Sequence, residues 1–219
     1  MLFTKSLLAK SRRSPKVFFI GYNKTGTKTL HHFFAANGYK AAHYVGRQHF
    51  WSERQPIAVT MAHNLEQGRH LLHRLGRYQV FSDMTFASQS MVIEANAFFR
   101  EMHKACPDAY FIFNDRPVEG WIKSRSAHAN VENGSFIERH AQTLGLTHEA
   151  TQAAWREQYH RHRADVLAYF ADSERFTLFN IEIEGPDRLA EFLRGDFRFD
   201  LGKWVHRGSG GSRQLLPGT

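Results

Sequence analysis

A short apolar run followed by a cationic, hydroxyl-rich turn carries the clearest chemistry in this chain. Val17 to Ile20 is apolar throughout, as in strands buried in a parallel sheet, and the turn after it reads Gly21-Tyr-Asn-Lys-Thr-Gly-Thr-Lys-Thr29. Leu30, Phe33 and Phe34 then recur at helical spacing. A strand, a tight loop and a helix in this order surround one point with backbone N–H groups and the positive end of a helix dipole. The stretch therefore predicts a phosphate or sulfate site.

The loop departs from the phosphate-binding pattern of common nucleotide hydrolases. That pattern, Walker A, is G-x-x-x-x-G-K-[ST]. Gly21 and Gly26 have the right separation, but Thr27 stands where the lysine belongs and Lys28-Thr29 comes one residue late. The prominent lysine is Lys24, before the second glycine. An ordinary ATPase is therefore disfavoured.

The same residues resemble a different anion-binding loop. Asn23-Lys24-Thr25-Gly26-Thr27-Lys28-Thr29-Leu30 is similar to the 5′-phosphosulfate loop of sulfotransferases, written K-[ST]-G-T-[TS]-x-L. The position of the lysine separates this pattern from Walker A. Taken alone, the loop leaves open a simpler interpretation, in which Lys24 and Lys28 only solvate a strand–helix turn.

A second motif far downstream strengthens the resemblance. Ala109 to Phe113 is another buried-strand run, and Asn-Asp-Arg116-Pro117 follows it. Pro117 suits the first position of a helix, where its missing N–H costs nothing. Sulfotransferases carry an arginine after this strand and a serine eight residues later, both on the 3′-phosphate of the co-substrate, and Arg116 and Ser124 have that separation. A guanidinium and a hydroxyl are suitable phosphate ligands.

The C-terminal third adds to the resemblance. The segment 176–181 is typical of a last core strand, and the helix pattern at 185–195 is similar to the one that closes many sulfotransferase domains. The likeness runs from about Lys16 to about Trp204, and is greatest to short bacterial-type members. It implies an α/β fold of the P-loop NTPase-like type, with three α/β/α layers around a central parallel sheet.

The resemblance also implies a reaction and its residues. A sulfotransferase moves a sulfuryl group from 3′-phosphoadenosine 5′-phosphosulfate to a hydroxyl or amine, and it needs no metal. By likeness, Lys24 is expected to stabilise the leaving phosphate. The residues implied for the co-substrate are Asn23, Lys24, Thr25, Gly26, Thr27, Lys28, Thr29, Arg116 and Ser124.

The general base is less directly indicated. Cytosolic sulfotransferases have a histidine after the third core strand, and here Asp83 stands at about that place. Asp83 is therefore the first candidate base and His43, at the end of the second strand, is the other. Asp83 could instead cap the next helix or orient Lys24. The family's adenine-stacking tryptophan is missing, because Thr29 occupies its position.

Composition limits the class of protein. The 219 residues, 42% of them hydrophobic, suffice for one domain with a substantial core. The net charge of +8 is spread along the chain without a nucleic-acid motif, so we expect anionic small ligands and no nucleic acid as partner. The 14 histidines are not at metal-ligand spacing, so no metal site is expected. With a single cysteine, no apolar run of membrane length and no signal peptide, a cytoplasmic protein without a membrane span is expected.

The order of patterns predicts the architecture. We expect a basic N-terminal arm at 1–15, a sulfotransferase domain at 16–204 and a flexible Gly/Ser-rich tail at 205–219. Alternating strands and helices indicate a parallel sheet covered on both faces. The expected strands are 16–21, 39–44, 78–83, 109–114 and 176–181, and the expected helices are 27–37, 59–75, 88–105, 117–128, 135–144, 148–171 and 186–194.

Two other functions are compatible with the sequence. One is a nucleotide or small-molecule kinase, which would need ATP and Mg²⁺, and the other is a catalytically silent nucleotide-binding module. The acceptor of a sulfotransferase could be a small molecule, a lipid or a glycan. The segments 46–57, with Phe50 and Trp51, and 129–145 are expected to shape its pocket.

Overall fold

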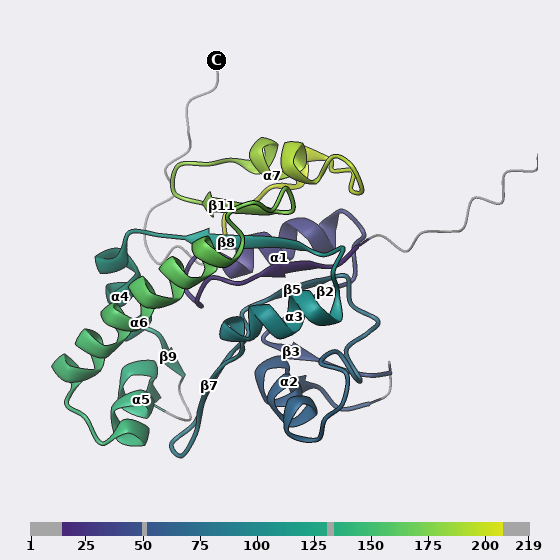
Figure 1. Cartoon of the computed structure of the whole chain (residues 1–219). Coiled ribbons are helices and arrows are strands. Elements are labelled where there is room, and N and C mark those ends of the chain that lie inside the picture. Colours follow the sequence, from purple (N-terminus) through teal and green to yellow (C-terminus); the bar gives the residue numbers. More distant parts are fainter. Residues whose placement is uncertain (1–14, 50–51, 131–133, 208–219) are drawn as a thin grey trace, which may run out of the picture.

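A seven-stranded sheet forms the centre of the computed structural model, which describes residues 15–49, 52–130 and 134–207. The strand order is β11-β8-β1-β5-β2-β3-β4, and the first five strands are parallel (Figure 1). The fold is therefore α/β, as the alternating pattern predicts. The strands of this sheet are β1 (Val17–Phe19), β2 (Ala41–His43), β3 (Val45–Gly46), β4 (Gln55–Pro56), β5 (Val80–Ser82), β8 (Tyr110–Asp115) and β11 (Phe176–Asn180).

Side chains alternate between the two faces of the central strands, as strand geometry requires. On one face, the ring of Phe18 stacks between those of Phe81 and Phe111, with centroids 5.1 and 5.4 Å away. On the other face, Phe19 packs edge-on against Phe34. All of these rings are buried. The unbroken apolar runs of the sequence are thus explained by a sheet that is buried on both faces.

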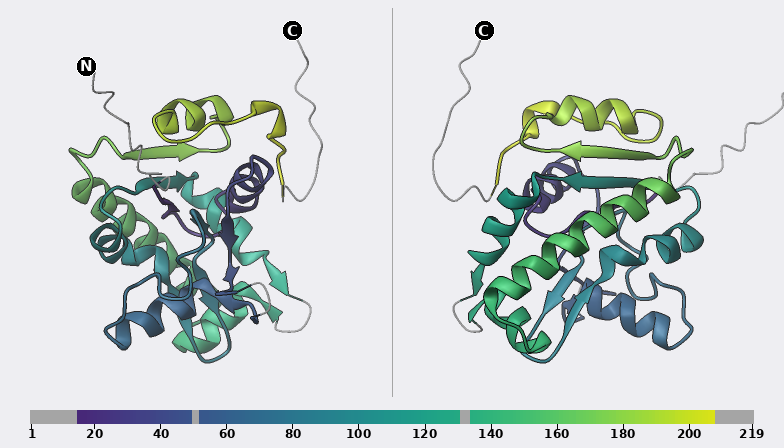
Figure 2. Two further views of the ribbon diagram at one scale, coloured as in Figure 1. Left: turned by 90° about the vertical axis from the view of Figure 1, so that its right-hand side faces the viewer. Right: turned by 60° about the vertical axis from the view of Figure 1, so that its left-hand side comes forward.

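Two groups of helices cover the sheet. Helices α1 (Thr27–Ala36) and α7 (Pro186–Leu193) share one core cluster, and the remaining helices share the other (Figure 1 and Figure 2). The result is a three-layer α/β/α arrangement. The helices of the second cluster are α2 (Ile57–Glu66), α3 (Phe99–Ala105), α4 (Val118–Ser126), α5 (Phe136–Leu144) and α6 (His148–Tyr169).

The prediction of a helix at 88–105 is wrong for the first half of that range. Residues 85–94 form a hairpin, in which β6 (Thr85–Ala87) pairs antiparallel with β7 (Val92–Glu94). A 3₁₀ turn, η1 (Ala95–Phe98), leads into α3, which occupies only the second half of the expected helix. The hairpin rests on contacts with distant parts of the chain: Thr143 Oγ1 donates to Ser88 O at 3.2 Å. Local spacing carries no signal for such a contact.

Two other expectations need correction at the sheet edge. The helix expected at 59–75 ends at Glu66, and Gly68 follows with a left-handed φ of 61°. The sheet also continues past its parallel part, because β3 and β4 add to β2 in antiparallel pairing. These strands are two residues long and give no periodic pattern in the sequence.

The ends of the chain lie mostly outside the described residues. The arm at 1–15 and the tail at 205–219 are described only at residue 15 and at 205–207. Among the described residues, every helix is too short or too polar to cross a bilayer.

Candidate functional site

The anion loop starts where β1 passes very close to β8. The N–H of Gly21 donates to Oδ1 of Asn114 at 2.9 Å, and a Cβ at position 21 would lie only 2.2 Å from the backbone oxygen of Asn114. Nδ2 of Asn114 also donates to the hydroxyl of Thr25, which in turn donates to the backbone oxygen of Tyr22. A buried side chain from β8 thus holds both ends of the loop.

The loop turns through two residues in the left-handed region. Lys24 has a φ of 66° and Gly26 a φ of 85°. A side chain at position 26 would also meet Ile181 at 2.7 Å, so glycine is required there for space as well as for conformation. Lys24 is one of four described non-glycine residues with positive φ; the others are Tyr44, Arg74 and Asp83.

Helix α1 begins directly after Gly26 and points its amino end at the loop. The amides of Thr29 and Leu30 both donate to Gly26 O, at 3.0 and 3.2 Å. Thr27 and Lys28 occupy the first two helical positions, where a helix offers no acceptor to the N–H groups. No side chain of the described residues caps this end. Backbone donors and the helix dipole therefore favour an anion there.

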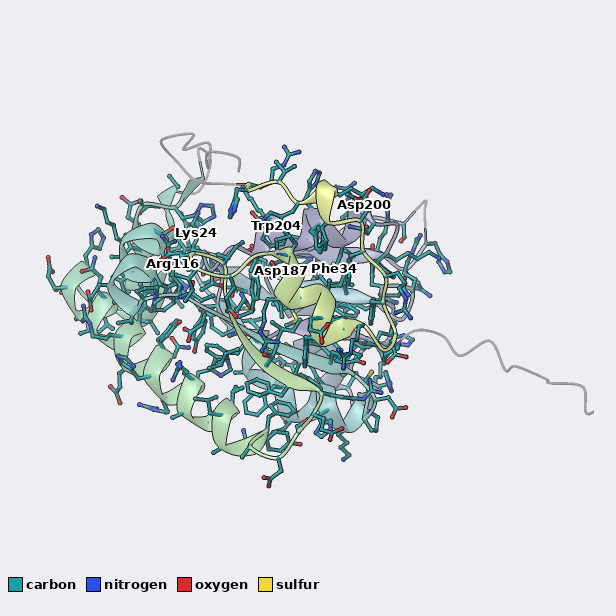
Figure 3. The ribbon with its side chains drawn as sticks, turned by 90° about the horizontal axis from the view of Figure 1, so that it is seen from above. Lys24, Phe34, Arg116, Asp187, Asp200 and Trp204 are labelled. Atoms are coloured by element: carbon teal, nitrogen blue, oxygen red, sulfur yellow. The ribbon has the colours of Figure 1, made fainter. Side chains whose placement is uncertain are left out.

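Arg116 reaches the same loop from the end of β8. Its Nη1 donates to the backbone oxygen of Lys24 at 3.1 Å, and Figure 3 labels both residues at the same end of the molecule. The backbone of Arg116 is held in place by Tyr159 on α6, whose hydroxyl donates to Arg116 O at 2.8 Å. Arg163 supports the neighbouring Asp115 by donating to its Oδ2 at 2.9 Å. The guanidinium is thus positioned by contacts that are far apart in the sequence.

A cavity of about 400 Å³ unites these groups at the carboxyl ends of the parallel strands. Its size is within the usual range for small-ligand sites. The cavity is lined by residues of both predicted cofactor motifs and by Asp83, the first candidate base. Its lining residues are Lys24, Gly26, Thr27, Lys28, Thr29, Asp83, Arg116, Ser124, His128, Ile181, Glu182, His206 and Arg207.

Three predicted site residues do not line this cavity. Asn23 is buried and its backbone oxygen accepts from Nε1 of Trp121 at 2.9 Å. Thr25 is fully buried, and its hydroxyl lies between Tyr22 and Asn114. His43 lies next to Asp83 but outside the lining, with 3.6 Å between Nδ1 of His43 and Oδ2 of Asp83. Asn23 and Thr25 therefore shape the loop from inside.

Thr29 lines the cavity, but its hydroxyl already has a partner. The N–H of Arg207 donates to Oγ1 of Thr29 at 2.7 Å, and Nη2 of Arg207 lies 2.9 Å from Nε2 of His32. Trp204 anchors this C-terminal segment by packing edge-on against Phe33. Residues beyond the expected domain end at 204 thus contribute to the cavity wall.

Sequence reasoning missed five residues of the lining. Ile181 and Glu182 come directly after β11, and the residues after parallel strands meet at one edge of the sheet, so this signal was available. No sequence pattern indicates the other three lining residues. His128 follows helix α4, and His206 and Arg207 lie in an irregular segment. Of the five, Arg207 adds a positive charge to the cavity and Glu182 adds a negative one. Burial lowers the pKa of His128, and the nearby Lys24 and Lys28 act in the same direction.

Asp83 is a carboxyl group with an unusual environment. Burial, helped by the negative charge of Glu94, raises its pKa to about 7, while Lys24 and Arg125 act in the opposite direction. Its backbone is also left-handed, with a φ of 53°. Perturbed carboxyl groups in strained backbone are concentrated at functional sites.

His43 is kept neutral beside this carboxyl. Burial lowers the pKa of His43 to about 4, and the nearby His31 and Lys28 act in the same direction. The ring of His31 lies against that of His43, with centroids 5.3 Å apart. At neutral pH the carboxyl therefore faces an uncharged imidazole. Burial lowers the pKa of Lys24 as well, with Lys28 adding to the effect.

A second cavity, of about 430 Å³, lies beside β3, β4 and α2 and shares no lining residue with the first. It includes Gly46, Arg47 and Gln55, from the segment expected to shape an acceptor pocket. Phe50 and Trp51 of that segment lie outside the described residues. Among the described residues, no group of three or more His, Cys, Asp or Glu could hold a metal ion.

The comparison with known families agrees with this geometry. The sequence model of the sulfotransferase domain family matches residues 16–197, which is most of the chain. The chain therefore belongs to the sulfotransferase domain family. No curated protein sequence matches it.

The environment of Asp83 predicts a pH-dependent stability. Its folded-state pKa is above its unfolded value of 3.8, so the native state holds more protons between about pH 4 and pH 7, and stability is lost as pH rises through that window. We expect Asp83→Asn to stabilise the fold at pH 8 by no more than about 4 kcal/mol, and by less at pH 5. Asparagine is a suitable variant because it tolerates a left-handed φ.

Urea unfolding of both proteins at the two pH values measures this difference. Each other titrating group is common to the two proteins, so the change in the difference with pH reports on residue 83. A gain in stability that is the same at pH 5 and pH 8 would contradict a raised pKa for Asp83.

Proposed function

We propose that this chain transfers a sulfuryl group from 3′-phosphoadenosine 5′-phosphosulfate to a hydroxyl or amine. The observation that carries the proposal is the meeting of Lys24, the amino end of α1, Arg116 and Ser124 around one cavity. A donor with two separate phosphate groups needs two separate anion sites. The loop and helix form one, and the arginine and serine form the other.

The residues present fit such a donor. When bound, it supplies the sulfuryl group and a phosphate leaving group. The N–H groups of Thr27 and Lys28, with the hydroxyl of Thr27, would hold the 5′-phosphosulfate, because the helix leaves these donors without acceptors. Arg116 and Ser124 would hold the 3′-phosphate. Asn23 and Thr25 would support the loop from inside. Thr29, whose amide is bonded to Gly26 and whose hydroxyl is bonded to Arg207, would shape the wall of the cavity.

Lys24 has the properties of a residue that acts on the leaving group. Burial lowers its pKa, so its ammonium gains more from a nearby negative charge than a fully solvated one would. Charge develops on the bridging oxygen as the bond to sulfur breaks. A cation that binds this charge more tightly than the ground state lowers the barrier.

Asp83 is the base that the geometry favours over His43. Asp83 lines the cavity with Lys24, whereas His43 does not line it. A carboxyl with a pKa near the working pH is suited to accept a proton and release it again. His43, uncharged above its lowered pKa, would position Asp83 without competing for the proton.

Calorimetry tests the donor directly. We expect adenosine 3′,5′-bisphosphate to bind the wild type more tightly than adenosine 5′-monophosphate or ATP with Mg²⁺. Arg116→Ala should weaken binding of the bisphosphate by about 1.5–3 kcal/mol, because it removes a charge-assisted contact. The affinity for the monophosphate should change little. Preferential binding of ATP with Mg²⁺ would favour a kinase instead.

Substitutions of the two loop lysines should have different effects, one mainly on turnover and the other mainly on binding. Lys24→Met should lower the rate of bisphosphate production from the donor by about 10²–10³-fold, with acceptors drawn from a panel of phenols and alcohols. Its affinity for the bisphosphate product should change far less. Lys28→Met is the matched control, since Lys28 lines the same cavity but is exposed, and it should mainly weaken binding. Loss of turnover in the Lys28 variant alone would contradict this assignment.

Asp83 should control the pH dependence of the reaction. Because the base must be ionised, kcat/KM should rise with pH through about 7 and level off above it. Asp83→Asn should lower turnover by about 10²–10⁴-fold and remove this ionisation from the profile. A variant that retains both the rate and the ionisation would move the role of base to another group.

A further inference from the structure

Arg116 is already paired with a carboxylate inside the cavity. Its Nε lies 2.7 Å from Oε1 of Glu182, and the Arg116 and Glu182 side chains are 27% and 40% exposed. Both residues line the cavity. One edge of the guanidinium, the group expected to bind the 3′-phosphate, thus faces an anion that belongs to the protein.

The backbone of Glu182 is held by the turn that follows β11. Its N–H donates to Oδ1 of Asn180 at 2.9 Å, and the N–H of Glu184 donates to Asn180 O at 2.8 Å. On the other side, Ile181 is packed against Gly26, where a Cβ would meet it at 2.7 Å. The turn therefore fixes the backbone of Glu182 at the cavity, from which its partly exposed carboxylate reaches Arg116.

We propose that Glu182 limits the affinity of the cavity for the 3′-phosphate and so speeds release of the desulfated product. This inference rests on the proposed donor. The Glu182 carboxylate and the 3′-phosphate compete for one guanidinium, and they repel each other when both are present. Any ligand with a 3′-phosphate therefore binds less tightly than it would without Glu182. The loss of affinity should be expressed mainly as faster dissociation, because affinity differences between related complexes lie mostly in the dissociation rate.

The position of the pair makes this cost selective. Arg116 joins the loop to the turn after β11, because its Nη1 donates to Lys24 O while its Nε pairs with Glu182. The 5′-phosphate is expected at the amino end of α1, which Lys24 and Gly26 precede. A ligand without the 3′-phosphate can leave the pair of Arg116 and Glu182 intact, and it should be almost insensitive to Glu182.

The test compares two nucleotides on matched variants. Dissociation constants of adenosine 3′,5′-bisphosphate and adenosine 5′-monophosphate are measured by calorimetry for the wild type, Glu182→Gln and Glu191→Gln. Glu191 is the charge-matched control, because it lies on α7, outside the cavity, in an exposed pair with Arg194. We expect Glu182→Gln to tighten the bisphosphate by about 3–10-fold and the monophosphate by less than about twofold. The control should change neither.

Two further measurements complete the test. The dissociation rate of the bisphosphate, followed by stopped flow, should fall in Glu182→Gln by nearly the same factor as its dissociation constant. In an Arg116→Ala background, Glu182→Gln should have a smaller effect, since the competition for the guanidinium is gone.

The outcomes separate this inference from the proposed function. Weaker binding of both nucleotides by Glu182→Gln would mean that Glu182 binds the nucleoside or positions Arg116, and would overturn the inference. Equal tightening of both nucleotides would indicate only a general field effect, and would overturn it too. A wild type that binds the bisphosphate no better than the monophosphate would instead overturn the proposed donor.

Discussion

The close contact between β1 and β8 is the constraint on which the site depends. Gly21 passes so near the backbone of Asn114 that no side chain fits between them, and the Asn114 side chain then bonds both Gly21 and Thr25. Because this side chain is buried, its hydrogen bonds cannot be exchanged for water without cost. The contact therefore holds the loop at Gly21 and at Thr25, and the left-handed residues Lys24 and Gly26 lie on either side of Thr25.

The same contact places the two proposed anion sites relative to each other. Residues after β1 form the loop, and residues after β8 lead directly into Arg116. Since the two strands are hydrogen-bonded neighbours, the distance between the sites is set by the sheet. A rigid sheet is a better support for such a constellation than a loop, because positional errors of one ångström are costly in binding and catalysis.

A buried ion pair outside the cavity affects the pKa of the candidate base. Arg125 is fully buried among aromatic rings, and it pairs with Glu94. Its Cζ lies 4.6 Å from the ring centroid of Trp155 and 4.9 Å from that of Trp121. Glu94 in turn raises the pKa of Asp83, after the larger effect of burial. The ionisation of the candidate base is thus coupled to a buried ion pair that lies outside the cavity lining.

The sequence determined the features that depend on neighbouring residues. The first strand, the loop and α1 follow from local pattern, and so does the parallel order of the core, because alternating strands and helices leave few topologies. The motifs around Lys24 and Arg116 could also be identified from residue type and spacing.

Tertiary structure decided the features that depend on residues distant in the sequence. Residues 85–94 form a hairpin instead of a helix, because packing against distant segments outweighs local propensity. The pairing of Glu182 with Arg116 and the raised pKa of Asp83 depend on groups that are remote in sequence. Electrostatic and burial effects act through space, so only the folded chain could reveal them.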